Sequence, residues 1–254
     1  MAGLAILAQR ETAEPVADLA RDHLIVALDL PDLADARATV TRLGDTVLYY
    51  KVGPHLFVSG LIDFIRDDLI GRGKKVFLDF KSVDIGDTMR RMASRVADLG
   101  VEFITVMGAT ATIAAAKDGR EGRPIPRILA VTLLTDHDEA DMQREYETKM
   151  SLRDFVAKRA IMAANAGADG VICSPREVVD IRQAVPRPNF FIVTPGIRPI
   201  GSPSDDQKRT ATPREAIAAG ADYLVIGRPI IKERDTLRAA LSILDEMQTA
   251  LDAR

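Results

Sequence analysis

Residues 76–88 read VFLDFKSVDIGDT, an apolar run of the kind that forms a buried β-strand but that ends in closely spaced charges. The period-two alternation of a strand puts Phe77, Asp79 and Lys81 on one face, and the apolar residues at 76, 78 and 80 on the other. Buried charges are costly unless they are paired or used. The charged end of this strand therefore predicts a place for chemistry or ligand binding.

Seven similar runs occur along the chain, and amphipathic segments separate them. The eight runs are LIVALDL (24–30), VLYYKVG (47–53), KVFLDFK (75–81), FITVMG (103–108), RILAVTLL (127–134), GVICS (170–174), FFIVTPG (190–196) and YLVIGRP (223–229). The segments between them have apolar residues every three or four positions, and several end in glycine, as helices do. Two connections, NAGADGVICS and AAGADYLVIGRP, share one pattern: a predicted helix is followed by Gly, then Ala-Asp, then a predicted strand.

Strict alternation of strand and helix predicts a parallel sheet. Eight such units in about 230 residues favour a closed (β/α)8 TIM barrel, whose active site lies at the C-terminal ends of the strands. No G-x-G-x-x-G follows the first run, which argues against a dinucleotide-binding sheet. We expect residues 1–20 to be an extension outside the repeat and residues 21–254 to form one barrel domain.

Composition excludes several other classes of protein. The 254 residues carry a formal net charge of -3, so electrostatics gives no reason to expect a nucleic-acid partner. No apolar run approaches the roughly 18 residues that span a bilayer, and the first ten residues lack the basic leader of a signal peptide. A single cysteine, Cys173, excludes an internal disulfide, and His23, His55 and His137 are too scattered to suggest a metal cluster. The sequence predicts a cytoplasmic protein without a membrane partner.

Polar residues stand at the carboxyl ends of most of the predicted strands. They are Asp29, Lys51, Asp79, Lys81, Thr135, Arg198 and Arg228, and Pro195 stands at the end of the seventh run beside Arg198. A simple ion pair closing one strand would explain Asp79 and Lys81 alone. Because a barrel brings all its strand ends to one mouth, Asp29 and Lys51 would converge on the same place, and four charges together indicate a use.

A second group of residues indicates a phosphate site. The segment 197-IRPIGSPSDDQKRTATP-213 is much longer than the roughly two to six residues that usually connect a strand and a helix, which suggests a lid. The last predicted strand ends in IGRP, with a backbone N–H at Gly227 and a guanidinium at Arg228. Loops after the seventh and eighth strands of such barrels frequently bind phosphate, and arginine suits that contact.

These residues together resemble the orotidine 5′-monophosphate decarboxylase family, in its bacterial subfamily. The matching pieces are ALD at Asp29, KVG at Lys51, LDFKSVDI from Leu78 to Ile85, VTLLT ending at Thr135, TPGIRP at Pro195 and Arg198, DQKR at Gln207, and VIGRPI at Gly227 and Arg228. They follow the family's order from residue 24 to about residue 232. The D-x-K-x-x-D element is shared with related phosphosugar enzymes, whereas KVG, GIRP with DQ, and IGRP are more discriminating.

The resemblance implies a carboxy-lyase that converts orotidine 5′-monophosphate to uridine 5′-monophosphate, the last step of de novo pyrimidine nucleotide biosynthesis, without a metal or other cofactor. Lys81 would donate the proton to the pyrimidine carbon that loses carbon dioxide, and Asp79 would lie beside the leaving carboxylate. Asp29 and Lys51 would hold the ribose hydroxyls and join the charge network.

The resemblance also implies a homodimer in which Asp84 and Thr88 reach into the partner's site, so that Lys81, Asp79, Asp84 and Lys51 form the catalytic set. Thr135 would contact the pyrimidine ring. The remaining substrate-binding residues would be those of the phosphate end and its lid: Pro195, Arg198, Gln207, Gly227 and Arg228.

The chain departs from the family at two places. Members commonly read D-I-P-N-T where this sequence reads D-I-G-D-T, with Gly86 and Asp87, and a glycine makes that turn more flexible. Met107 stands where histidine is frequent, and we expect it to pack inside the barrel. We expect Cys173 to be a buried small residue rather than a nucleophile.

Three other functions fit part of the pattern. A metal-dependent phosphosugar lyase or epimerase on the same scaffold would hold Mg²⁺ with Asp79 and Asp84, but it would leave Lys51 and Gln207 unexplained. A Schiff-base aldolase would need a neutral Lys81, which neighbouring carboxylates oppose. A barrel kept only for binding would have no need of the complete acid and base set.

Overall fold

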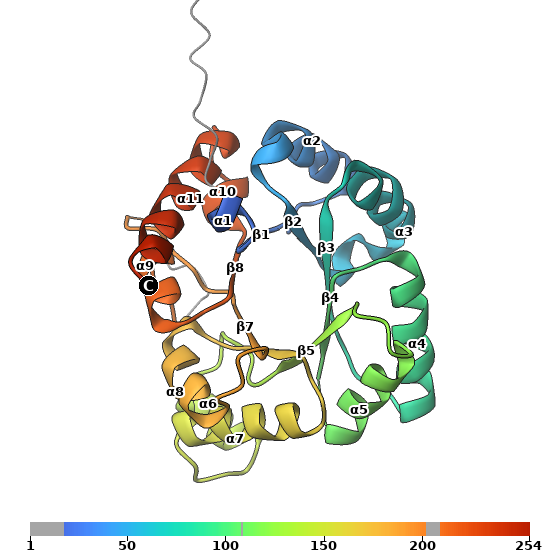
Figure 1. Ribbon diagram of the computed structural model, residues 1–254, viewed down its shortest axis with the longest axis vertical. Helices are drawn as coiled ribbons and strands as arrows, with labels where there is room; N and C mark the ends of the chain where they lie inside the picture. Colours follow the sequence, from blue (N-terminus) through green and yellow to red (C-terminus); the bar gives the residue numbers. More distant parts are fainter. Residues whose placement is uncertain (1–17, 108, 202–208) are drawn as a thin grey trace, which may run out of the picture.

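The protein is described by a computed structural model for residues 18–107, 109–201 and 209–254. Its strands are parallel, pair in sequence order and close on themselves, and a ring of helices surrounds them (Figure 1). The strands are β1 Leu24–Ala27, β2 Tyr49–Val52, β3 Lys75–Ser82, β4 Phe103–Val106, β5 Arg127–Val131, β6 Gly170–Ile172, β7 Phe191–Thr194 and β8 Tyr223–Ile226. The predicted (β/α)8 barrel is confirmed.

The helices follow the predicted amphipathic segments. They are α1 Asp18–Arg21, α2 Leu33–Leu43, α3 Leu61–Asp63, α4 Gly86–Leu99, α5 Thr110–Gly119, α6 Glu139–Glu145, α7 Leu152–Asn165, α8 Val178–Ala184, α9 Pro213–Ala219, α10 Arg228–Ile231 and α11 Thr236–Asp252. Short 3-10 turns occupy Gly44–Thr46, Pro54–Ser59, Ile70–Arg72 and Pro175–Glu177, and a π-helix spans Phe64–Leu69. The side chains of Asp32, Ser151 and Thr212 accept a hydrogen bond from an N–H of the first helical turn, which sets where α2, α7 and α9 begin.

Most strands end earlier than the apolar runs suggest. The first run continues to residue 30, yet β1 ends at Ala27, so Asp29 lies beyond it. The last run continues to residue 229, yet β8 ends at Ile226 and Arg228 already begins α10. Strand pairing stops where neighbouring strands diverge into their loops, and hydropathy alone does not show where that happens. Asp29 and Arg228 therefore lie beyond their strands, whereas Lys51 belongs to β2 and Asp79 and Lys81 belong to β3.

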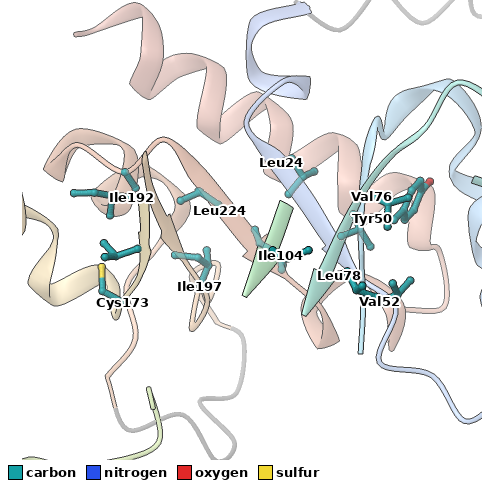
Figure 2. Packing of buried hydrophobic residues seen from close by; sticks show 14 of the residues in the cluster. Leu24, Tyr50, Val52, Val76, Leu78, Ile104, Cys173, Ile192, Ile197 and Leu224 are labelled. Atoms are coloured by element: carbon teal, nitrogen blue, oxygen red, sulfur yellow. The ribbon is translucent and has the colours of Figure 1, made fainter. Parts of the chain in front are cut away.

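Two apolar cores follow from the alternation along the strands. One lies between barrel and helices and includes Leu24 of β1, Val76 and Leu78 of β3, and Ile104 of the neighbouring β4 (Figure 2). The other fills the barrel and includes Phe77. The two faces predicted for the strand at 76–81 are therefore those observed.

Aromatic rings close the N-terminal end of the barrel interior. The ring centroids of Phe103 and Tyr223 are 5.0 Å apart, and those of Tyr49 and Tyr223 are 5.6 Å apart, both edge-to-face. Tyr49 precedes Lys51 by two positions on β2, and Phe77 precedes Asp79 by two on β3. The polar layer therefore lies directly on top of this aromatic layer.

The two similar connections found in the sequence form the same structure twice. The Asp169 carboxylate accepts hydrogen bonds from the Ile128 N–H at 2.7 Å and from Arg120 at 2.7 Å. The Asp222 carboxylate likewise accepts one from the Ile192 N–H at 2.6 Å and one from an arginine of α8. Each aspartate thus ties the start of one strand to the preceding strand and a helix.

Two further expectations concern the boundary of the barrel domain after residue 20 and the absence of a membrane-spanning segment. The boundary after residue 20 stays a prediction, because residues 1–17 lie outside the described part; Ala20 itself is buried and its N–H donates to Gln248 of α11. Within the ranges that the structure describes, no helix has both the length and the apolar character to cross a membrane.

Candidate active site

A cavity of about 210 Å³ lies at the C-terminal ends of the strands. The predicted residues that line it are Asp29, Lys51, Asp79, Lys81, Thr135, Pro195, Arg198, Gly227 and Arg228. Apolar side chains of the barrel, among them Leu133, Ile172 and Val225, complete its wall. The cavity therefore has a charged side formed by β1–β3, a cationic side after β7 and β8, and an apolar wall between them.

Four charged side chains on one side of the cavity alternate in sign. Lys51 Nζ lies 2.9 Å from Asp29 Oδ1 and 3.5 Å from Asp79 Oδ2. Lys81 Nζ lies 3.0 Å from both oxygens of Asp79. The side chains of Lys51 and Asp79 are only 12% and 13% exposed, whereas Asp29 is 52% exposed. The array therefore runs from the solvent down to Asp79.

The ionisation of Asp79 reflects a balance between burial and its neighbours. Burial on its own raises the pKa of this carboxyl group, but the ammonium groups of Lys51 and Lys81 and the hydroxyl of Thr105 lower it, and the net pKa is below the ordinary value. Asp79 is therefore an anion held between two cations.

Thr105 of β4 is a residue of this site that the sequence analysis did not single out. Its Oγ1 accepts a hydrogen bond from the Lys81 N–H at 2.8 Å and donates one to Asp79 Oδ1 at 2.9 Å. Only 1% of the residue is exposed. The signal that could have found it is its position: alternation from Phe103 places residue 105 inside the barrel, where a polar side chain is unusual.

Glycine at position 227 permits the close approach of β8 to β1. A Cβ atom there would lie 3.3 Å from the Cβ of Ala27 and 3.7 Å from Asp29 Oδ2. Any larger side chain would press on Asp29, which belongs to the charged array. Gly227 therefore has a steric role beside the backbone N–H that the sequence suggested.

The long segment after β7 is anchored at both ends of its described part. Ile197 forms a bridge with Ala211, and the Arg198 N–H donates to the Ala211 carbonyl at 2.9 Å. Gln207, which the sequence analysis places on a lid, lies outside the described residues. The bridge fixes where Arg198 enters the cavity wall.

Arg209 is a second residue that sequence reasoning missed. Its buried guanidinium pairs with the Glu177 carboxylate and donates to the Leu134 carbonyl at 3.0 Å. Its own carbonyl accepts a hydrogen bond from Ser174 at 3.3 Å. Arg209 thus joins the end of the long segment to residues that follow β5 and β6, and Leu134 is part of the cavity wall. No local pattern links positions so far apart.

Asp84 and Thr88 are not brought into this cavity. Both are exposed, and Asp84 Oδ1 accepts a hydrogen bond from the Ile85 N–H at 2.7 Å. Within one chain they lie outside the array formed by Asp79 and Lys81.

The unusual turn that contains Gly86 adopts ordinary geometry. Gly86 is the first residue of α4, and a Cβ atom there would make only a normal 3.7 Å contact with Ala115. The additional charge of Asp87 pairs on the same helix with Arg91 at 2.6 Å and Arg90 at 3.5 Å. The residues that depart from D-I-P-N-T therefore form the start of a regular helix.

Two other residues at this end of the barrel, Met107 and Cys173, contribute to packing rather than to catalysis. Met107 packs against the inner apolar core, as expected. Cys173 follows β6 and is fully buried in the outer core (Figure 2), where burial raises the pKa of its thiol to about 12. A thiol with such a pKa is a poor nucleophile.

Comparisons with known proteins identify the family of this chain. The model of the Orotidine 5′-phosphate decarboxylase / HUMPS family matches residues 22–243. The chain is 48% identical to the orotidine 5′-phosphate decarboxylase of Rhodopseudomonas palustris (strain BisA53), over 90% of this chain and 95% of that protein, and 46% identical to that of Afipia carboxidovorans, over 91% and 96%. The crystal structure of orotidine 5′-phosphate decarboxylase from Lactobacillus acidophilus matches with a TM-score of 0.78 and 36% identity, covering 89% of this chain and 99% of that one. By sequence and by fold, the chain belongs to the Orotidine 5′-phosphate decarboxylase / HUMPS family.

Proposed function

We propose that this protein is a carboxy-lyase that converts orotidine 5′-monophosphate to uridine 5′-monophosphate in pyrimidine nucleotide biosynthesis. The observation that carries the proposal is the alternating array of Asp29, Lys51, Asp79 and Lys81 at the mouth of the barrel. The curated relatives, which share nearly half of its residues, bear the name of this enzyme.

The array suits the charge that this reaction develops. When the bond from the pyrimidine ring to its carboxylate breaks, the electron pair stays on a ring carbon that has no ordinary electron sink. The Lys81 ammonium stabilises that charge and then gives the carbon a proton, and a proton from water restores the ammonium. Because Asp79 already holds the ammonium in place, little reorganisation accompanies the transition state.

We assign the rest of the cavity to the parts of the nucleotide. Asp29 and Lys51 hold the ribose hydroxyls, and Thr135 with the apolar wall receives the pyrimidine. The phosphate lies toward the cationic side formed by Pro195, Arg198, Gly227 and Arg228, and in this proposal Gln207 completes that subsite. Phosphate binding takes no part in the chemistry, but its binding energy aligns the base over Lys81.

The working unit in this proposal is a cytoplasmic homodimer. Asp84 and Thr88 are exposed and lie outside the cavity of their own chain, which leaves them available to a partner. Val83 and Ile85, on either side of Asp84, are 65% and 74% exposed, as apolar residues at an interface between subunits would be in a single chain. The site of each chain is then completed by the Asp84 carboxylate of the other.

A metal-dependent phosphosugar enzyme is not favoured. Both oxygens of Asp79 accept hydrogen bonds from Lys81, and one of them also accepts from Thr105. A magnesium ion at Asp79 would lie against the ammonium groups of Lys51 and Lys81, which repel it. A Schiff base would need Lys81 Nζ as a nucleophile, and here that atom donates to both oxygens of Asp79.

The decisive experiment follows the loss of orotidine 5′-monophosphate absorbance with purified protein in excess EDTA. The wild type turns over in chelator, and Lys81→Ala lowers kcat by at least about 10³-fold, because proton donor and stabilising charge are both lost. Lys75→Ala, at the opposite end of the same strand, is the matched control and keeps wild-type turnover. A wild type that is inactive with and without Mg²⁺ contradicts the assignment.

A further inference from the structure

The pairing of β3 with β4 is irregular at the catalytic end. Phe77 pairs with Phe103 and Leu78 with Ile104, but the next pair joins Ser82 to Val106. Residues 79–81 of β3 therefore stand opposite the single residue at position 105 of β4. Such a bulge bends a strand and redirects its side chains. Here the bulge contains both Asp79 and Lys81.

A side chain replaces the missing ladder bond in this bulge. The Lys81 N–H donates to Thr105 Oγ1 at 2.8 Å instead of to a main-chain carbonyl. Because the hydroxyl accepts that bond, its one hydrogen is free to point to Asp79 Oδ1, 2.9 Å away. The contact with Asp79 therefore has a defined direction.

The backbone of Lys81 is in a sparsely populated conformation. Its φ is +48°, in the left-handed region that residues with a Cβ rarely adopt. Such conformations persist only where the surroundings hold them, and they concentrate at functional sites. The hydrogen bond from the Lys81 N–H to Thr105 Oγ1 helps to hold Lys81 in this left-handed conformation.

We propose that Thr105 is a positioning residue for catalysis: its hydroxyl holds the β3 bulge and the Asp79 carboxylate, and through them it aims the Lys81 ammonium at the reacting carbon. The inference rests on the proposed function and deepens it. Thr105 is not part of the cavity wall. It acts through Lys81 and Asp79, to each of which it makes one hydrogen bond.

Loss of this hydroxyl acts on the chemical step more than on binding. Without it the Lys81 N–H loses its acceptor and Asp79 loses a donor, while the residues assigned to ribose and phosphate keep their contacts. A small misplacement of a catalytic group lowers its rate by up to about 10²-fold. We therefore expect a lower kcat with a nearly unchanged KM.

The test compares two buried threonines. Thr105→Val removes the hydroxyl at constant shape, and Thr132→Val makes the same change on β5's C-terminal side, where the hydroxyl donates to the Ile172 carbonyl at 3.0 Å. The two residues are 1% and 2% exposed, so a loss of stability alone should be similar. Thr105→Ser keeps the hydroxyl, and Thr105→Ala replaces the valine variant if that variant does not fold.

We expect Thr105→Val to lower kcat for orotidine 5′-monophosphate by about 10- to 100-fold with KM within about threefold. Thr105→Ser restores most of kcat, and Thr132→Val stays within about threefold of wild type. Equal effects of the two valine substitutions, or a wild-type kcat in Thr105→Val, overturn the inference.

A crystal structure of Thr105→Val separates this inference from the proposed function. We expect Lys81 to leave the left-handed region and its ammonium to move away from Asp79. An unchanged Lys81 overturns the inference whatever the substrate is. If the wild type does not decarboxylate the nucleotide, the proposed function fails, and the position of Lys81 still decides the structural claim about Thr105.

Discussion

Asp79 is the residue on which the other charges of the site converge. Three side chains donate toward its two oxygens, and they lower its pKa in spite of burial. The sequence could identify Asp79, Lys81 and Lys51 because chemistry in a barrel lies at strand ends. It did not single out Thr105. Alternation could have placed that hydroxyl inside the barrel, but its contacts with Asp79 and Lys81 depend on a bulge, and periodicity assumes that strands pair without one.

The lowered pKa of Asp79 makes one part of the stability depend on pH. A carboxyl group whose pKa is lower when folded stabilises the fold above its unfolded pKa, and this contribution is lost as the pH falls through the folded pKa. The free energy of unfolding of wild type should therefore exceed that of Asp79→Asn most at neutral pH. The difference should shrink as the pH falls below about 4.

Urea unfolding of both proteins between about pH 7 and about pH 3.5 measures that difference. Asp87→Asn is the control, because the ion pairs of Asp87 with Arg90 and Arg91 are exposed, and such pairs contribute about 1 kcal/mol or less. A difference between wild type and Asp79→Asn that stays constant or widens in acid would show that the two lysines do not favour the ionised carboxyl group.

At the scale of the element, the alternation of strands and helices was predictable, and the ends of the strands were not. Apolar runs continue into the loops at the mouth because Leu28 and Leu133 are as buried as the strand residues before them. Hydropathy reports burial, whereas a strand ends where its hydrogen bonds end. The shared Gly-Ala-Asp pattern indicated a repeated connection, but only the structure showed what the aspartates bind.

Asp169 and Asp222 tie strand starts together at the face opposite the cavity. We expect Asp169→Asn and Asp222→Asn each to lower the free energy of unfolding by about 1–3 kcal/mol, since each loses charge-assisted bonds to an N–H and to an arginine. The kcat should stay at its wild-type value, because the N-terminal end of a barrel contributes to stability rather than to chemistry.

Denaturant unfolding and steady-state turnover of the same preparations check this prediction. Asp98→Asn, which breaks an exposed ion pair with Arg123, is the control and should change little. A variant at position 169 or 222 that loses kcat while keeping its stability contradicts the separation of the two barrel faces.

At the scale of the whole molecule, the homodimer is predicted only from the resemblance to the family and not from any pattern in the sequence. An isologous interface leaves no periodic pattern, and its sign in a single chain is exposed apolar surface such as Val83 and Ile85 beside Asp84. A site completed by two chains has a consequence that one chain cannot imitate. Defects in different subunits can be combined in one dimer.

Mixed dimers of Lys81→Ala and Asp84→Ala should recover activity that neither variant has alone. If Asp84 acts across the interface, each mixed dimer contains one site with both defects and one intact site. Random reassociation of equal amounts then gives about a quarter of the wild-type specific activity. No recovery after dissociation and mixing, with dimers verified by sedimentation, would mean that Asp84 serves its own chain.

The layer of Tyr49, Phe103 and Tyr223 beneath the charges also limits how substrate and products can reach and leave the cavity. Because these rings fill the N-terminal end of the interior, the proposed substrate would enter and leave the cavity through its C-terminal mouth. In the proposed function, carbon dioxide is released beside Asp79, which is only 13% exposed, at the inner end of the cavity. In the proposed reaction the two products would then share one exit, and the product that leaves more slowly would delay the next substrate.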